Sequence, residues 1–393
     1  MGTTSSFFGG SGGATAIPNA SYDLIRKATY KSVLTIDIKK TYVYLIPYSD
    51  TQFVAYSGNN NDPLTMGHYT IGSDGTLTQD LAPTTLGFNN QSRGGVGNSN
   101  GHFLIASSNS SSDYRFDKVV WNGSSFALTN ISNVASGSIK HLCFTSMYSG
   151  YMLGAHKRTD GSNMQCAGID PNGNAISATL SDSTKYGDND QVACCGTADG
   201  LAFIGRHADG QSSTDYAIGS QYIHLGSVSN NTFAIGSQTR DTSHASNTFQ
   251  QINSIAIHPA KQGGAYWYAS DSNASVATGM LFSKGMASYT ARTSDLRHNS
   301  ASLAKNYMTN SDYGNFRHCN GTVVDGDKGS ILAVDGNTQM GMPNSLAKVG
   351  LKNVNSQNIN SGDCKVVQVG KYLVVAADVA SADKVVLNVY EIE

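Results

Sequence analysis

Charge is scarce in this sequence. Asp, Glu, Lys and Arg together make up 14% of the 393 residues, and the formal net charge is -2. Without a dense stripe of Lys and Arg, the chain lacks the counterion release that drives most nucleic-acid binding. We therefore expect no nucleic-acid partner, and we expect hydroxyl and amide groups to keep the surface soluble.

Long apolar runs are missing as well. The longest apolar stretches, at 372–377 and 384–392, are strand-length and fall short of the roughly 20 residues that span a bilayer. The first residues, MGTTSSFFGGSGG, have neither a basic start nor a continuous apolar core, so no secretory signal is expected. We expect no membrane insertion and synthesis in a cytoplasm.

Motifs of catalysis and metal binding are also absent. The six cysteines form no CxxC pair, and the sequence has no HExxH or phosphate-loop motif; we also expect no nucleophile elbow. Two acid-rich stretches, 188–190 and 325–328, are better explained as turns, and the second lacks later ligands of a calcium loop. We therefore predict no catalytic residue, no metal site and no cofactor, and a protein that is not an enzyme.

What the chain does contain is a repeat. A short apolar strand follows a tight polar turn seven times, starting at Gln52, His102, Tyr151, Leu201, Ala265, Ser330 and Tyr372. The first four copies are spaced by about 50 residues, the length of a four-stranded propeller blade with its turns. Gly turns such as 73–75, 122–123 and 171–173 mark where the third strand reverses into the fourth. The repeated apolar strand is expected to be the second strand of each blade.

The last copy is followed by too little chain for a whole blade. The alternating segment Val33–Ile38 precedes the first complete blade and could supply the missing outer strand beside 384–392. Such pairing would close the ring and leave only short exposed edges. The sequence therefore predicts an all-β fold: a seven-bladed β-propeller over residues 31–393, with four antiparallel strands per blade and the ring closed by Val33–Ile38.

Residues 1–30 form a Gly/Ser-rich segment in which Phe7 and Phe8 stand out as large apolar groups. We expect an attachment arm anchored by Phe7 and Phe8 on a neighbouring protein; the alternative is a tail whose two Phe side chains dock on the same chain. The Phe-Phe-Gly-Gly stretch and the charge-poor Ser/Thr/Asn/Gly composition resemble structural proteins of tailed-bacteriophage virions. This resemblance implies residence in a virion, with other virion proteins as partners of the arm.

Long insertions are predicted to gather on one rim of the propeller, at 208–221, 239–251 and 295–317. They carry side chains suited to stacking and hydrogen bonding with a sugar or a protein: Arg240, His244, Arg297, His298, Tyr307, Tyr313 and Arg317. We call these seven residues the candidate rim. The alternative is that the insertions only cap the central channel.

Three functions follow from these features. The first is a non-enzymatic virion component in the tail, fibre or head decoration, with the arm as tether and the propeller displayed toward a host glycan or receptor. The second is a soluble glycan-binding lectin, which would not need the arm. The third is a polysaccharide hydrolase, which would need paired carboxylates converging at the channel.

Overall fold

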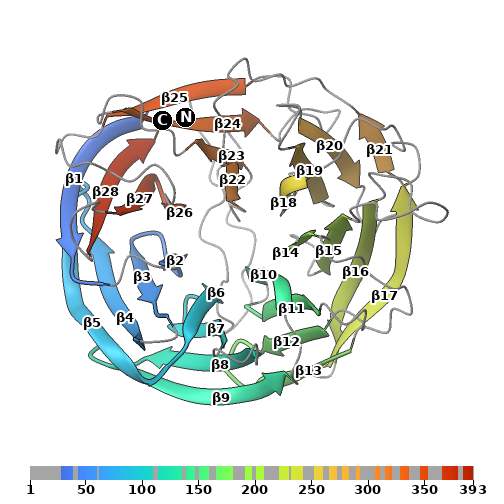
Figure 1. Cartoon of the computed structure of the whole chain (residues 1–393), viewed down its shortest axis with the longest axis horizontal. Coiled ribbons are helices and arrows are strands. Elements are labelled where there is room, and N and C mark those ends of the chain that lie inside the picture. Colours follow the sequence, from blue (N-terminus) through green and yellow to red (C-terminus); the bar gives the residue numbers. More distant parts are fainter. Residues whose placement is uncertain are drawn as a thin grey trace.

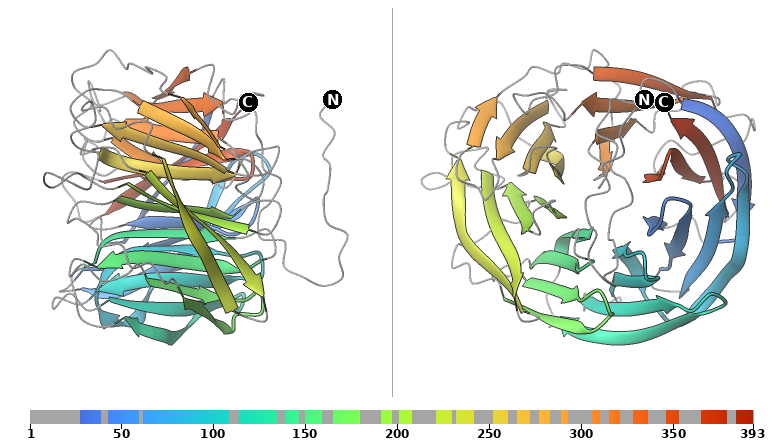
Figure 2. Two further views of the ribbon diagram at one scale, coloured as in Figure 1. Left: turned by 90° about the vertical axis from the view of Figure 1, so that its right-hand side faces the viewer. Right: turned by 180° about the vertical axis from the view of Figure 1, so that it is seen from behind.

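The computed structural model describes residues 28–38, 43–59, 62–108, 114–134, 139–146, 150–158, 165–179, 191–196, 201–207, 221–229, 232–241, 252–259, 265–271, 277–282, 289–292, 306–309, 315–320, 328–335, 346–352, 365–378 and 384–392. The regular structure within them is β-strand, arranged in five four-stranded sheets and one eight-stranded sheet. In Figure 1 the strands lie around a ring, with β2, β6, β10, β14, β18, β22 and β26 nearest its centre. Figure 2 shows the same ring from its edge and from behind. Within the described residues, no helix long and apolar enough to cross a bilayer is found.

Two sheets follow each other directly along the chain. The first sheet contains β2 (Tyr44–Pro47), β3 (Gln52–Ser57), β4 (Pro63–Ile71) and β5 (Leu77–Asn89). The second sheet contains β6 (Gln91–Gly97), β7 (His102–Ser108), β8 (Tyr114–Trp121) and β9 (Phe126–Val134). In both sheets the strands are antiparallel and adjacent in chain order, as in a meander.

The eight-stranded sheet consists of two such meanders. One contains β10 (Ile139–Ser146), β11 (Met152–Arg158), β12 (Gln165–Ile169) and β13 (Ala175–Thr179). The other contains β14 (Gln191–Gly196), β15 (Leu201–His207), β16 (Gln221–Ser229) and β17 (Thr232–Asp241). The fourth strands β13 and β17 pair in parallel, with Ser177 opposite Thr232, and this pairing joins the two meanders into one sheet.

Two further meanders complete the middle of the chain. One contains β18 (Ile252–Pro259), β19 (Ala265–Asp271), β20 (Ala277–Phe282) and β21 (Tyr289–Arg292). The other contains β22 (Asn306–Thr309), β23 (Asn315–Asn320), β24 (Lys328–Asp335) and β25 (Leu346–Lys352).

Strands from both ends of the chain share the terminal sheet. It contains β26 (Lys365–Val369), β27 (Tyr372–Asp378), β28 (Val385–Ile392) and, beside β28, β1 (Ala28–Ile36). The pairing of β1 with β28 is antiparallel, from Ala28 opposite Ile392 to Ile36 opposite Val385. Compared with the expected segment Val33–Ile38, the strand starts earlier, because β28 offers partners as far as Ile392. It also ends earlier, because β28 begins at Val385.

Two predictions in the β22–β25 sheet are wrong. The apolar copy at Ser330 lies in β24, the third strand, and not in the second strand of its sheet. Both central strands of a sheet have neighbours on either side, so an apolar run does not distinguish the second from the third. The segment 295–317, expected to be a connecting loop, contains β22 and the start of β23, whose short polar sequences lack the apolar run of the repeat.

The described core lies between the faces of neighbouring sheets. One cluster joins the terminal and first sheets and includes Ile36, Val374, Leu387 and Phe53. Two further clusters join the first sheet to the second and the second sheet to the eight-stranded one. Because a sheet packed on both faces must bury both sets of side chains, β3 and β7 are buried at every position after the first residue. This double burial explains why the repeated strands read as continuous apolar runs.

Candidate functional site

Side-chain contacts between neighbouring sheets, either hydrogen bonds or ring stacking, recur at corresponding places in the described chain. In each case, residues of one sheet touch the end of the third strand of the next sheet or the turn that follows it. We call these contacts seams. The terminal seam joins the terminal sheet to the first sheet, the first seam joins the first sheet to the second, and the second seam joins the second sheet to the eight-stranded sheet.

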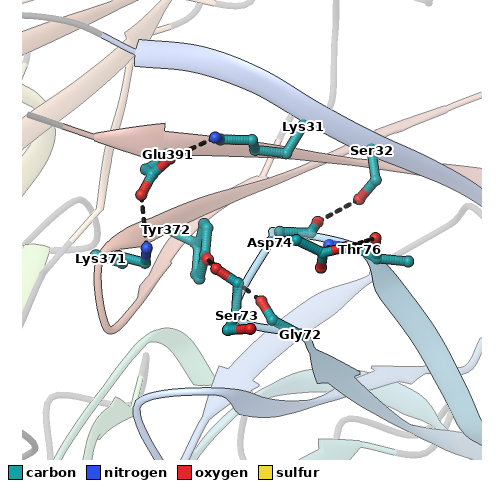
Figure 3. A network of polar contacts seen from close by, with 10 residues as sticks. Lys31, Ser32, Gly72, Ser73, Asp74, Thr76, Lys371, Tyr372 and Glu391 are labelled. Atoms are coloured by element: carbon teal, nitrogen blue, oxygen red, sulfur yellow. Dashed lines mark hydrogen bonds and ion pairs between the residues drawn. The ribbon is translucent and has the colours of Figure 1, made fainter.

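The terminal seam is the most extensive polar network (Figure 3). The Tyr372 hydroxyl donates to the carbonyl oxygens of Ser73, at 2.8 Å, and Gly72, at 3.2 Å, in the β4–β5 turn. The Ser32 hydroxyl of β1 donates to the Gly75 carbonyl at 2.6 Å and accepts from the Leu77 amide at 3.2 Å. Side chains from near both ends of the chain therefore bind the same turn of the first sheet.

Beside this turn, one carboxylate binds two ammonium groups. Glu391 in β28 lies 2.5 Å from Lys31 Nζ in β1 and 2.6 Å from Lys371 Nζ at the start of β27. Hydrogen bonds from Lys31 and then Lys371 lower the pKa of Glu391 to about 2, and the bond to Glu391 raises the pKa of Lys371. The three side chains tie β1, β28 and β27 together at the edge of the seam (Figure 3).

The turn that receives these contacts needs glycine. Gly75 has φ +88°, and a Cβ there would lie 2.6 Å from Lys31 Cβ. Asp74 supports the same turn, because its carboxylate accepts from the Thr76 amide at 2.9 Å and from the Thr76 hydroxyl at 2.8 Å. The Asp-Gly dipeptide that marks a strand reversal thus also provides the surface on which β1 lies.

The first seam centres on His68 of β4, which is 1% exposed. Its Nδ1 lies 2.7 Å from Asp80 Oδ2, and its Nε2 is hydrogen-bonded to the Tyr48 hydroxyl. Its ring stacks on Trp121 of β8, with centroids 4.3 Å apart and planes inclined by 10°. Burial lowers the pKa of His68, while its hydrogen bond to Asp80 acts in the opposite direction.

The second seam uses amide and ammonium donors. Asn100 Nδ2 donates to the Pro171 carbonyl at 3.0 Å, and Lys118 Nζ donates to the Gly173 carbonyl at 2.8 Å. His102 lies against the same turn, where burial is the main cause that lowers its pKa and the charge of Lys118 adds to the effect. Asp170 shapes this turn by accepting from the amides of Asn172 and Asn174 at 2.9 and 2.7 Å.

A buried ion pair lies within the second sheet. The Asp117 side chain is fully buried, and it accepts from Arg115 and, at 3.3 Å, from Asn130 Nδ2. Burial raises the pKa of Asp117, and the ion pair with Arg115 opposes that shift. Nearby, the buried Tyr56 hydroxyl donates to the Ala106 carbonyl at 3.0 Å, which links the first and second sheets again.

These groups are arranged to hold sheets together. Among the described residues there is no group of three or more His, Cys, Asp or Glu side chains that could hold a metal ion. Three buried polar atoms in the described part of the chain lack a hydrogen-bond partner: Tyr69 Oη, His102 Nδ1 and Asn388 Oδ1. The carboxylates and imidazoles of the seams are bound mainly to partners in the same chain.

The candidate rim is described only in part. Arg240 lies in β17 opposite Tyr222, Tyr307 lies in β22 opposite Cys319, and Arg317 lies in β23 opposite Thr309. Tyr307 and Arg317 therefore share a sheet, and Arg240 belongs to another. The other rim residues and both proposed anchors lie outside the described residues: His244, Arg297, His298, Tyr313, Phe7 and Phe8.

Sequence reasoning missed the seams. His68 stands in a strand with no flanking motif, and its partners Asp80 and Trp121 come from two other strands, so spacing along the chain gives no signal. The Gly turns between the third and fourth strands were the feature of the sequence that could have pointed to the seams. They predict the strand reversals correctly, but their carbonyl groups also receive the contacts from the preceding sheet.

Comparison with known proteins bears on the fold. No model of a known protein family matches this chain, and no curated protein matches it. Solved structures do match: a protein from Lactobacillus plantarum has 11% identity and a TM-score of 0.53, over 85% of this chain and 94% of that one. At this identity the likeness shows that the two chains share a fold.

Two other matches have lower TM-scores. The Aleuria aurantia lectin in complex with Fucα1-6GlcNAc has 12% identity and a TM-score of 0.47, over 79% of this chain and 97% of that one. The polysaccharide lyase Uly1 has 10% identity and a TM-score of 0.49, over 95% of this chain and 100% of that one. The resemblance to virion proteins stays a prediction.

Proposed function

We propose that the chain is a seven-bladed β-propeller that is closed by β1 and binds glycans without enzymatic activity. In this arrangement the two meanders of the eight-stranded sheet count as two blades, and the terminal sheet is the last blade. Three observations support it: the meander order of each sheet, the pairing of β1 with β28, and the repetition of the seams.

The observation that carries glycan binding is the composition of the chain. The chain has 20 Tyr and only 14% charged residues, so its polar groups are mainly hydroxyls and amides. Neutral sugars are bound by such groups together with aromatic rings that stack on their C–H faces. The protein is thus better suited to a neutral polyhydroxyl ligand than to a highly charged one.

One described place combines these groups. Trp121 and Phe126 are half-buried with ring centroids 4.8 Å apart, and the turn between them, residues 122–125, is exposed at all four positions. Asn122, Ser124 and Ser125 supply the amide and hydroxyls of that turn. The candidate rim is the second place, because it combines Tyr, Arg and His side chains.

A panel of immobilised glycans, probed with the purified full chain, tests the proposal. Binding to at least one neutral glycan, saturable and competed by the free sugar, is expected. Tyr307→Ala with Arg317→Ala tests the candidate rim, Phe126→Ala tests the described turn, and Thr129→Ala, exposed in β9, is the matched control. Loss of a stacking residue should weaken binding by about tenfold or more. A chain that binds no glycan, or that releases shortened products from a polysaccharide, would contradict the proposal.

Residence in a virion is a separate proposal. It rests on residues 1–30 and on Phe7 and Phe8, and it can be separated from glycan binding by truncation. Removing residues 1–27 leaves β1 intact, so a soluble lectin should retain its sugar affinity. If the arm is an anchor, the same truncation should abolish incorporation into particles while sugar binding remains.

A further inference from the structure

His68 has a proton-accepting arrangement that glycan binding does not require. It is almost fully buried, yet both of its ring nitrogens have hydrogen-bond partners. The Asp80 side chain beside it is 32% exposed and so connects the imidazole with solvent. Through this carboxylate the buried imidazole can exchange a proton with water.

The hydrogen bonds of this cluster fit two protonation states. In the neutral state, Nδ1–H donates to Asp80 and the Tyr48 O–H donates to Nε2. In the charged state, Nε2 carries the added proton and donates to the Tyr48 oxygen. The Tyr48 O–H then donates to Gln52 Oε1, which lies 3.0 Å away.

One proton from water therefore forms one new N–H bond, and one hydrogen bond reverses its direction. Gln52 is held in the required orientation, because its Nε2 donates to Thr70 Oγ1 at 3.4 Å. Thr70 in turn donates to Asp80 Oδ2 at 2.6 Å. The two ring nitrogens and the Tyr48 hydroxyl hydrogen are paired in either state, whereas Gln52 Oε1 accepts the Tyr48 proton only in the charged state.

The same imidazole lies directly on the neighbouring sheet. Its stacking partner Trp121 belongs to β8, and Tyr48 contacts Phe103 of β7 edge to face, with centroids 5.2 Å apart. A change of charge on His68 therefore alters the ring contacts between the first and second sheets. A cation on an indole face gains from the ring quadrupole, whereas a buried cation loses hydration.

We propose that His68 is a proton-responsive joint between the first and second sheets, which takes up a proton through the Tyr48–Gln52 hydrogen-bond reversal and thereby changes the strength of the first seam. The joint is a conformational device of the fold; it shares Trp121 with the proposed glycan turn, but its hydrogen-bond reversal does not require a bound glycan.

The surrounding charges determine the direction of the effect. From the first sheet, the titratable groups that face His68 are Tyr48 and Asp80. From β8, the face toward the first sheet presents Asp117 further along the strand, already bound by Arg115. Burial lowers the pKa of His68 from 6.5, so the unfolded chain takes up the proton first as pH falls. Stability from this group is present above about pH 6.5, is lost as pH falls toward the folded pKa, and then levels off.

Trp121 emission tests the proposal directly. The chain has two tryptophans, so Trp267→Phe leaves Trp121 as the single reporter. A protonated imidazole stacked on an indole quenches its fluorescence. Titration from about pH 8 to about pH 4 should show a loss of emission with a midpoint below 6.5. His68→Gln, which keeps one donor and one acceptor but cannot be charged, should abolish this step.

Two further variants keep His68 and predict a direction. Gln52→Leu removes the acceptor that only the charged state uses, and Asp80→Asn removes the carboxylate that favours that state, so each should shift the midpoint to lower pH. His102→Gln, at the second seam, is the matched control and should leave the midpoint unchanged. The proposal is overturned if the step is missing from the parent, if it persists in His68→Gln, or if Gln52→Leu leaves the midpoint where it was.

Discussion

Glu391 Oε2 and Lys31 Nζ lie 2.5 Å apart, although Lys31 belongs to β1, the first described strand, and Glu391 to β28, the last. The same carboxylate binds Lys371 at 2.6 Å. This triple contact lies beside the β4–β5 turn that receives Tyr372 and Ser32, so the terminal seam joins both chain ends and the first sheet (Figure 3). A closed ring would depend on this seam.

The Glu391 carboxylate of the terminal seam should give the protein a contribution to stability that is lost in acid. The pKa of Glu391 is lowered to about 2 from 4.5, so its contribution is complete above about pH 4.5 and disappears as pH falls toward 2. Glu391→Gln should lower the thermal midpoint at neutral pH and flatten its decline over that acid range. High salt should reduce the difference from the parent, since the ammonium groups are partly exposed. Lys384→Met, exposed immediately before β28, is the control, and an equal flattening there would contradict the assignment.

The packing of β1 should contribute to the core. Ile36 is fully buried in the cluster between the terminal and first sheets, whereas its neighbour Thr35 is exposed. Ile36→Ala should therefore destabilise the chain by about 2–5 kcal/mol in denaturant unfolding. Thr35→Ala, in the same strand, should change the free energy of unfolding by less than about 0.5 kcal/mol. Similar effects of the two substitutions would show that β1 is not packed as described.

Gly370 should be the least replaceable of the turn glycines. It has φ +55° in the β26–β27 turn, and a Cβ there would lie 2.3 Å from the Asp50 carbonyl oxygen of the first sheet. Gly123 has φ +94° but no atom within 4 Å of the same position. Gly123→Ala should destabilise the chain by about 1–2 kcal/mol, because only its backbone conformation is unfavourable. Gly370→Ala should destabilise it more, because the added Cβ also meets the Asp50 carbonyl oxygen. Equal losses of stability in the two variants would mean that the β26–β27 turn does not approach Asp50.

Asn98 should link the second sheet to the eight-stranded sheet through its amide. It is fully buried; its Oδ1 accepts from the Asn100 and His102 amides, and its Nδ2 donates to the Gly150 carbonyl at 3.2 Å. Asn98→Ala leaves these groups unpaired and should cost about 1–3 kcal/mol. Asn98→Asp keeps the acceptor but places a carboxylate beside the Gly150 carbonyl, so it should also be destabilising, and more so at neutral than at acid pH. A stable, pH-independent Asp variant would argue against the link.

Much of the fold was predictable, for a physical reason. Strands such as β3 and β7 are buried on both faces, so their sequences are apolar throughout and stand out at the start of each copy. The Gly turns between third and fourth strands were equally predictable, because a positive φ favours glycine at that position, as at Gly75 and Gly173. The pairing of Val33 with the last strand was also predicted, and the structure adds the register, with Val33 opposite Asn388.

The order of strands in the β22–β25 sheet was not predictable in the same way. An apolar run reports burial, and burial is shared by second and third strands, so Ser330 was assigned to the wrong one. The seams were invisible for a different reason. Each joins a side chain to a backbone carbonyl or ring in another sheet, as Tyr372 does with Ser73, and no local pattern encodes such a partner.

Hydrogen exchange of the backbone amides tests ring closure most directly. If β1 completes the last blade, the amides of Ala28–Ile36 and Val385–Ile392 that face each other should be protected and should exchange together in one opening event. Exchange of β1 at the rate of a free chain, while β28 remains protected, would contradict closure of the ring.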